Sequence, residues 1–487
     1  METTNLNNRI MLIETLGASD RTAGVGTHGN SLEPYALEWL AGTLEANGFE
    51  VKILAQLSDL DILYSATEFQ PAIIGYGVWT HTLNRSLRLA GMVKAAMPSV
   101  IQVAGGNHPS LDLTTLESNF DFAVIGEGEA TFLELCQKLT GKGQGPAWDT
   151  DGVAHFGEIC TIAPRRCRAD FNALPAPIRS QEFLARAKSW NLSYPNPELQ
   201  TGVGQVSYSR GCPFSCSFCV SPLVWGKRMT YREATKVAAE IKMLRDEFKV
   251  NLLYWSDLTW NLEHDKIMEV CRAINAAGLH NSPEDSADHL SESVHWYALV
   301  KPGLTLEETR AMAKAGCSKV GIGIESFDED GIREFGKPYK RSVLRESLEA
   351  LDEAGIVTRA LMVLGRPDET DQSVNRMIEQ LKTLPIDQVR VQFLTPFPGT
   401  KTWDETERTD DDFDHYNGEY PVVKSRLSPD ELLAARDRIV SEFYSSTEYA
   451  DRCKSKLERF PHLKESYRWW FDDLAERGIV DLRWIAK

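Results

Sequence analysis

The chain has 487 residues, which is enough for two or three domains with cores of their own. Its net charge of −17 argues against a nucleic-acid substrate, because neutralising a phosphate backbone takes a basic surface. Hydrophobic residues make up 42% of the chain, but no apolar run approaches the roughly 18–20 residues that cross a bilayer, and the N-terminus shows no secretory signal. These features predict a globular, cytoplasmic protein without a membrane span that does not act on nucleic acid.

Residues 1–145 alternate apolar runs with amphipathic segments. This alternation predicts a parallel, doubly wound sheet, that is, a Rossmann- or flavodoxin-like α/β domain. Ligands of such sheets bind outside the carboxyl ends of the strands. The predicted strands are 9–14, 50–54, 72–78, 100–104 and 120–125, and the predicted helices are 33–47, 83–96 and 130–139.

Three of these predicted strands end in glycine-rich loops. Glycine allows a ligand to approach the backbone closely and also allows a turn with positive φ. Ordinary strand-to-helix turns explain each loop by itself, but three such loops at corresponding strand ends indicate a site for a large, flat ligand. The candidate residues are Gly75 and Gly77, then Gly105 and Gly106, then Gly126, Glu127 and Gly128.

Residues 146–200 contain scattered prolines and predict a connector with little regular structure. Residues 201–425 then repeat strand and helix, which predicts a partial (β/α)6 barrel, short of the eight units of a TIM barrel. Residues 426–487 predict a C-terminal helical extension. In the barrel, the predicted strands are 205–209, 251–255, 294–299, 319–324, 358–364 and 388–393, and the predicted helices are 232–248, 265–277, 306–315, 342–354 and 372–381.

Three cysteines, Cys212, Cys216 and Cys219, follow the first barrel strand in the sequence SRGCPFSCSFCVSP. Gly211 and Pro213 indicate a turn there. Zinc is an alternative, but a structural zinc site usually takes four ligands in paired arms, and the sequence nearby has no second arm. A cubane iron–sulfur cluster normally takes four cysteines, so three would leave one iron open. An open iron can bind S-adenosylmethionine (SAM) for radical chemistry.

This cysteine segment resembles the cluster loop of the radical SAM superfamily. The stretches AVIGEGEATFLEL, AGGNHPS, GRPDET and TPFPGT resemble its cobalamin-dependent group, with Asp368 where that group usually has glycine. The resemblance implies a [4Fe-4S] cluster on the three cysteines and cobalamin in residues 1–145. The motif Asp-x-His-x-x-Gly, whose histidine ligates cobalt in many cobalamin proteins, is absent, because His28 lacks the aspartate. Cobalamin without a protein histidine on cobalt is therefore expected.

Two other barrel strands end in candidate SAM contacts. Asp257 follows the second strand, where its carboxylate can accept hydrogen bonds from the SAM ammonium group or cap the next helix. Glu325 and Ser326 end the fourth strand and resemble the position that contacts SAM in this family. A buried glutamate without a partner is costly, which favours a ligand role for Glu325 if it faces inward.

The resemblance implies a C-methyltransferase that moves a methyl group from methylcobalamin to an unactivated carbon of a small molecule through a 5′-deoxyadenosyl radical. It also implies an external electron donor of the flavodoxin or ferredoxin type. Two alternatives remain open from the sequence. The same architecture serves cyclisation, oxidation or ring rearrangement without net methyl transfer, and a non-catalytic iron–sulfur electron-transfer or sensor protein is a remote alternative.

Overall fold

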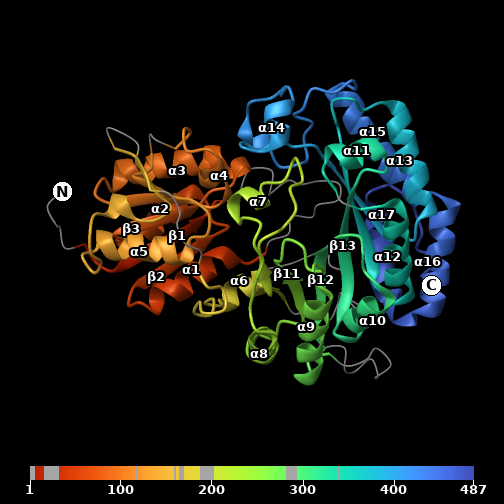
Figure 1. Ribbon diagram of the computed structural model, residues 1–487, viewed down its shortest axis with the longest axis horizontal. Helices are drawn as coiled ribbons and strands as arrows, with labels where there is room; N and C mark the ends of the chain where they lie inside the picture. Colours follow the sequence, from red (N-terminus) through yellow and green to blue (C-terminus); the bar gives the residue numbers. More distant parts are fainter. Residues whose placement is uncertain are drawn as a thin grey trace.

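The structure is a computed structural model with two α/β parts and a C-terminal helical layer (Figure 1). His28 lies outside the described residues. The structure describes residues 6–15, 32–116, 119–157, 161–163, 169–186, 202–280, 293–337 and 339–486.

The N-terminal part is a seven-stranded sheet in the order β2-β1-β3-β4-β5-β6-β7. The first five strands run parallel, in the flavodoxin-like order 2-1-3-4-5, and the last two are antiparallel. This confirms the predicted doubly wound sheet. The strands are β1 (Arg9–Glu14), β2 (Glu50–Ala55), β3 (Ile73–Gly77), β4 (Ile101–Gly105), β5 (Phe122–Val124), β6 (Val153–His155) and β7 (Thr161–Ile162).

Helices cover both faces of this sheet because successive residues of β1 point to opposite sides. Leu12 packs in one hydrophobic cluster with residues of α1 and α5, and Ile13 packs in another with residues of α2 and α3. The helices are α1 (Tyr35–Glu45), α2 (Asp59–Phe69), α3 (Leu83–Ala96), α4 (Asn107–Leu111), α5 (Glu129–Leu139) and, after the sheet, α6 (Gln181–Arg186).

Strands β6 and β7 and helix α2 were not expected from the sequence. The two strands lie beyond residue 145, so the sheet extends into the segment predicted as a connector. Strands of two or three residues carry too little alternation to be recognised. In α2 only Ile62 and Ala66 are buried, which leaves its apolar stripe weak.

The second part is a six-stranded parallel sheet in the order β15-β14-β13-β12-β11-β8, with each strand beside its chain neighbour. Helices α8, α9, α10, α12 and α13 follow successive strands, which confirms the predicted partial barrel. The strands are β8 (Val203–Val206), β11 (Leu252–Trp255), β12 (His295–Val300), β13 (Cys317–Glu325), β14 (Val357–Leu364) and β15 (Gln388–Phe393), and the helices are α8 (Ala234–Asp246), α9 (His264–Ala276), α10 (Leu306–Lys314), α12 (Arg341–Glu353) and α13 (Asp371–Thr383).

Short elements at the barrel mouth and a helical layer complete the fold. The C-terminal helices pack on β15 and α13, and their apolar side chains share one core with the barrel. Among the described residues, no helix is both long and apolar enough to cross a membrane. The short elements are β9 (Ser209–Arg210), β10 (Thr230–Tyr231), α7 (Ser221–Val224), α11 (Glu329–Glu334) and α14 (Lys401–Glu405), and the C-terminal helices are α15 (Pro429–Tyr444), α16 (Thr447–Arg459) and α17 (Lys464–Glu476).

A buried ionic network joins the N-terminal part to the barrel. Arg179 lies between the two parts, 2.7 Å from Glu33 and 3.1 Å from Glu38 at the start of α1. Its other nitrogen donates to Glu240 of α8, which also accepts a 2.6 Å bond from Arg232. Burial raises the pKa of Glu38 to about 9, with the charge of Glu33 as the next cause. With Glu38 protonated, two carboxylates balance two guanidiniums.

This network predicts a pH-dependent stability. Between about pH 4.5 and 9 the folded chain keeps a proton on Glu38 that the unfolded chain has released. The free energy of unfolding therefore falls as pH rises through this window, by up to about 1.4 kcal/mol per pH unit. Glu38→Gln should flatten this dependence and be more stable than the native chain at pH 8. Urea unfolding at pH 6, 7 and 8 measures it. Glu247→Gln changes an exposed residue and should leave the pH dependence of the free energy of unfolding unchanged. If Glu38→Gln kept the native pH dependence, the proton could not be assigned to Glu38.

Candidate active site

The three cysteines lie in one loop after β9, where the barrel meets the N-terminal part. Cys212 is buried, and Cys216 and Cys219 are partly buried. The amide of Cys219 donates to the carbonyl of Cys216 at 3.1 Å, and the amide of Cys212 donates to Gly226 at 3.4 Å. Among the described residues, no three side chains of His, Cys, Asp or Glu converge as around a single metal ion. Each cysteine of a four-iron cluster binds a different iron, so three cysteines spaced along one loop fit such a cluster.

Gly211 shapes the start of the cysteine loop. Its φ is +101°, and a Cβ there would overlap the carbonyl oxygen of Arg228. Any side chain therefore displaces the strand end that leads into Cys212. This steric requirement explains why a glycine directly precedes the first cysteine of the loop.

Gly211→Ala should prevent the protein from holding a cluster. The left-handed backbone costs about 1–3 kcal/mol for a residue with a side chain, and the overlap with Arg228 adds to it. We expect iron and sulfide to fall to background after anaerobic reconstitution. Gly278→Ala is the matched control, because its φ is +61° but no atom lies within 4 Å of the added Cβ. Normal iron content in Gly211→Ala would refute the steric argument.

The end of β13 packs against the cysteine loop and carries Glu325. The amide of Ser217 donates to the carbonyl of Phe335 at 3.2 Å, just after α11. Lys337 follows, with its ammonium 2.9 Å from the Glu325 carboxylate. Burial raises the pKa of the Cys216 thiol to about 11, and the same ammonium opposes part of this rise. The structure therefore brings Glu325 to the cysteines through Lys337, which sequence reasoning missed.

Glu325 has a backbone conformation that residues with side chains rarely adopt. Its φ is +62°, and the register of β13 against β14 shifts between Gly323 and Glu325. The hydroxyl of Tyr339 donates to the carbonyl of Ile324 at 2.6 Å and holds this bend. Such strain is concentrated at functional sites, where the surrounding structure enforces it.

Asp257 is 2% exposed and faces the end of β8. Its carboxylate accepts hydrogen bonds from the amides of Tyr208 at 3.0 Å and Ser209 at 2.6 Å, and from the Ser209 hydroxyl at 2.5 Å. Burial raises the pKa of Asp257 to about 6. The capping alternative is wrong, because the N-cap of α9 is Glu263. Asp257 thus fixes the corner that leads into the cysteine loop, and its contact with SAM stays a prediction.

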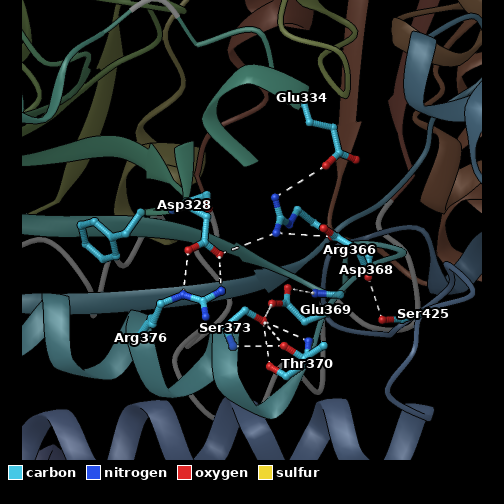
Figure 2. A network of polar contacts seen from close by, with 12 residues as sticks. Asp328, Glu334, Arg366, Asp368, Glu369, Thr370, Ser373, Arg376 and Ser425 are labelled. Atoms are coloured by element: carbon cyan, nitrogen blue, oxygen red, sulfur yellow. Dashed lines mark hydrogen bonds and ion pairs between the residues drawn. The ribbon is translucent and has the colours of Figure 1, made fainter. Parts of the chain in front are cut away.

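A polar network around Arg366 was missed in the sequence (Figure 2). Arg366, directly after β14, is 4% exposed. Its guanidinium lies 3.7 Å from Asp328, 3.6 Å from Glu334 and 3.3 Å from Asp368. Gly331 leaves the space in which the Arg366 guanidinium and the Ser326 hydroxyl meet. The GRPDET stretch therefore contributes a buried cation next to Ser326 as well as the turn that its glycine and proline indicate.

The same stretch also starts α13 (Figure 2). Glu369 accepts hydrogen bonds from the amide of Gly365 at 3.2 Å and from the hydroxyl of Ser373. Thr370 is the N-cap of α13, with its hydroxyl accepting a hydrogen bond from the amide of Ser373. Burial raises the pKa of Glu369. These hydrogen bonds connect the loop that follows β14 to the first turn of α13.

The glycine-rich loops lie at the carboxyl ends of β3, β4 and β5, as expected. Some of these glycines have a packing reason: a Cβ at Gly75 would lie 3.0 Å from Phe132, and one at Gly128 would lie 3.1 Å from Leu40. At Gly77 and Gly105 the nearest atoms would be at 3.7 and 3.8 Å, so a side chain would fit. A ligand that covers the strand ends is a reason for glycine at these two.

The other candidate residues of the glycine-rich loops are Gly106, Gly126 and Glu127, and both glycines have a positive φ. Gly106 has a φ of +104°, and a Cβ there would lie 2.8 Å from the carbonyl oxygen of Val78. Gly126 has a φ of +79°, and its amide donates to the Ser110 hydroxyl at 2.8 Å. Glu127 is 6% exposed. Because β3, β4 and β5 are adjacent parallel strands, the three loops lie along one edge of the sheet.

A buried ion pair connects this edge to the cysteine loop. Glu129, next to Gly128, lies 2.6 Å from Arg210, which precedes Gly211. The guanidinium lies 4.1 Å from the ring centroid of Phe171. Figure 1 shows α7, just after the cysteines, between the N-terminal part and the barrel, and α4 contacts it. The glycine-rich edge and the cysteine loop are therefore held at one interface.

Comparisons with known proteins agree with this arrangement. A B12-binding domain matches residues 21–136, and the radical SAM superfamily matches residues 206–381. An uncharacterized methyltransferase of Pyrococcus horikoshii is 28% identical over 78% of this chain and 79% of its own. Hopanoid C-3 methylase of Methylococcus capsulatus is 22% identical over 81% of this chain and 73% of its own.

Solved structures share the whole fold. The radical SAM methyltransferase TsrM of Kitasatospora setae, with cobalamin and a [4Fe-4S] cluster bound, has a TM-score of 0.69 and 17% identity over 97% of this chain and 100% of its own. The cobalamin-dependent SAM radical enzyme OxsB has a TM-score of 0.68 and 14% identity over 97% of this chain and 71% of its own. These matches confirm the resemblance found in the sequence. The chain thus carries a B12-binding domain at residues 21–136 ahead of a radical SAM domain at residues 206–381.

Proposed function

We propose that the protein is a cobalamin-dependent radical SAM methyltransferase that moves a methyl group to an unactivated carbon of a small molecule. The Glu129–Arg210 pair carries this proposal, because it holds the glycine-rich edge of the B12-binding domain against the cysteine loop of the barrel. When bound, the cluster supplies the electron that cleaves SAM, and cobalamin carries the methyl group. Relatives named as methyltransferases or methylases support the proposal.

The residues of the chain then have distinct tasks. Cys212, Cys216 and Cys219 hold the cluster, and Lys337 places the Glu325 carboxylate beside them. Ser326 and Asp257 stand at the ends of β13 and β11, where SAM would lie over the barrel mouth. The edge formed by Gly75, Gly77, Gly105, Gly106, Gly126, Glu127 and Gly128 receives cobalamin.

Several further assignments belong to the same proposal. The division of the chain is a cobalamin-binding domain at 1–145, a connector at 146–200 that contributes β6 and β7 to the sheet of that domain, a radical SAM barrel at 201–425 and a helical module at 426–487. The protein works in the cytoplasm on a small molecule and not on nucleic acid, with a flavodoxin- or ferredoxin-type electron donor. The net charge of −17 supports the exclusion of nucleic acid.

A second candidate is a cyclase or a ring-rearranging enzyme without net methyl transfer. The anaerobic magnesium-protoporphyrin IX monomethyl ester cyclase of Rubrivivax gelatinosus favours it, with 23% identity over 84% of this chain. The mass of the product separates the two, because methyl transfer adds one carbon to the substrate.

Anaerobic reconstitution with iron, sulfide and hydroxocobalamin tests the proposal without a known substrate. We expect about four irons and one cobalamin per chain. After reduction, SAM should yield S-adenosylhomocysteine as its methyl group is transferred, and 5′-deoxyadenosine as it is cleaved. Four irons without bound cobalamin would refute methyl transfer through cobalamin. A reduced, cluster-loaded protein that leaves SAM intact would favour the electron-transfer or sensor alternative.

A further inference from the structure

A small basic cavity lies at the open edge of the barrel sheet, apart from the candidate active site. Strand β15 ends the sheet, and no other strand in the described part of the chain pairs with its outer edge. There the amide of Val389 donates to the hydroxyl of Tyr444 of α15 at 2.9 Å. Beside this contact is a cavity of about 30 Å³. It is lined by Arg359, Val389, Arg390, Val391, Glu419, Arg436, Val440, Tyr444, Trp470 and Arg477.

The cavity wall contains more cations than anions. Four arginines line it, and arginine stays protonated in proteins. Glu419 lies 3.2 Å from Arg436 and 3.6 Å from Arg390, and Asp473 lies 3.0 Å from Arg477. A third carboxylate, on Asp437, is 4.0 Å from Arg436 but two-thirds exposed to water. Four guanidiniums thus face two buried or partly buried carboxylates and one that is mostly solvated.

The unsatisfied groups around the cavity are all donors. The Nε atoms of Arg390, Arg436 and Arg477 and the Nε1 atom of Trp470 are buried without a hydrogen-bond partner among the described residues. Trp470 is 8% exposed. Within the cavity lining, the structure describes no buried side-chain acceptor that lacks a partner. A buried polar group left unpaired costs about 1–3 kcal/mol, so this clustering requires an explanation.

We propose that this cavity binds a small monovalent anion, either chloride or the carboxylate of a small organic acid. An anion accepts several charge-assisted hydrogen bonds and offers no donor, which is what four unpaired N–H groups require. A water molecule needs about 10–15 Å³, so a cavity of 30 Å³ accommodates the equivalent of two and excludes large organic anions.

The anion would connect the barrel to the C-terminal helices. Arg390 comes from β15, Arg436 from α15, and Trp470 from α17, with Arg477 as the C-cap of the same helix. An ion bound among them adds bonds that exist only when both helices pack on β15. It therefore stabilises this packing by binding the folded chain and not the unfolded one.

Urea unfolding of the full chain in sodium chloride, sodium formate and sodium gluconate at equal ionic strength tests the proposal. Gluconate is too large for the cavity. We expect chloride or formate to raise the unfolding midpoint above that in gluconate, with saturation as the anion concentration rises. A response to chloride alone identifies a halide site, and a response to formate identifies a carboxylate site. Identical midpoints in the three salts would overturn the proposal.

Variants tie the effect to the cavity. Arg477→Met should abolish the anion-dependent shift. Trp470→Phe keeps an aromatic side chain, although a smaller one, and removes the Nε1 donor, so it should weaken the anion response several-fold even if Arg477→Met fails to fold. Arg483→Met is the matched control, because Arg483 is half-exposed and pairs with Asp481 outside the cavity. An anion response that persists unchanged in Trp470→Phe would overturn the assignment.

Discussion

Replacing Cys216 with alanine is expected to abolish the iron–sulfur cluster and, with it, SAM cleavage. Cys216 lies between the other two cysteines of the loop, so its loss leaves two protein thiolates for a cluster that uses three. Iron, sulfide and 5′-deoxyadenosine should all fall to background after anaerobic reconstitution. Cys212→Ala and Cys219→Ala are expected to behave alike.

Cys271→Ala is the control for this prediction. Cys271 is buried in α9 and its alanine variant loses only a small side chain from the core. It should retain the cluster at close to the native iron content. Native iron content and SAM cleavage in Cys216→Ala would refute the assignment of the loop, and a bound zinc in the native protein in place of iron would restore the zinc alternative.

Arg210→Met is expected to destabilise the interface between the B12-binding domain and the barrel. The variant leaves the carboxylate of Glu129, 6% exposed, without the guanidinium that lies 2.6 Å away in the native chain. Breaking a buried ion pair by removing one partner typically costs about 3–5 kcal/mol. Urea unfolding should report a loss of this size. Equilibrium dialysis should report weaker cobalamin binding, because Gly128 of the glycine-rich edge directly precedes Glu129 at the start of α5.

The double variant Arg210→Met with Glu129→Gln controls for the stranded charge. With both charges removed, we expect most of the lost stability to return, since a neutral pair costs far less to bury. The cobalamin affinity should stay reduced if the ion pair positions the glycine-rich edge against the cysteine loop. A single variant within about 0.5 kcal/mol of the native chain, the range of ordinary surface substitutions, would contradict this role.

The anion cavity and the Arg179 network are expected to make the stability of the chain depend on the anion and on the pH of the buffer. Because Glu38 is expected to titrate with a pKa of about 9, mildly acidic to neutral buffers favour the folded chain over alkaline ones. Chloride or formate in the buffer would stabilise the packing of α15 and α17. Reconstitution experiments should therefore hold both pH and anion constant.

The sequence by itself predicted most of the architecture, and it predicted the cysteine loop as the site of the cluster. The strands of both sheets carry runs of apolar residues, and Leu37, Leu40 and Leu44 show the helical spacing of α1, so local periodicity was sufficient. The spacing of Cys212, Cys216 and Cys219 is also local, because all three cysteines lie in one short loop. The weak stripe of α2 and the short β6 and β7 lacked such a signal and were missed.

Only the tertiary structure decided which charged residues face one another. Arg179 meets Glu33 and Glu38 across more than 140 positions of sequence, and Arg210 meets Glu129 across 81. Arg366 sits beside Ser326, and Lys337 beside Glu325, for the same reason. Such pairs leave no periodic pattern, since any of the many charged residues in the chain offers the same chemistry until the strands and helices are packed.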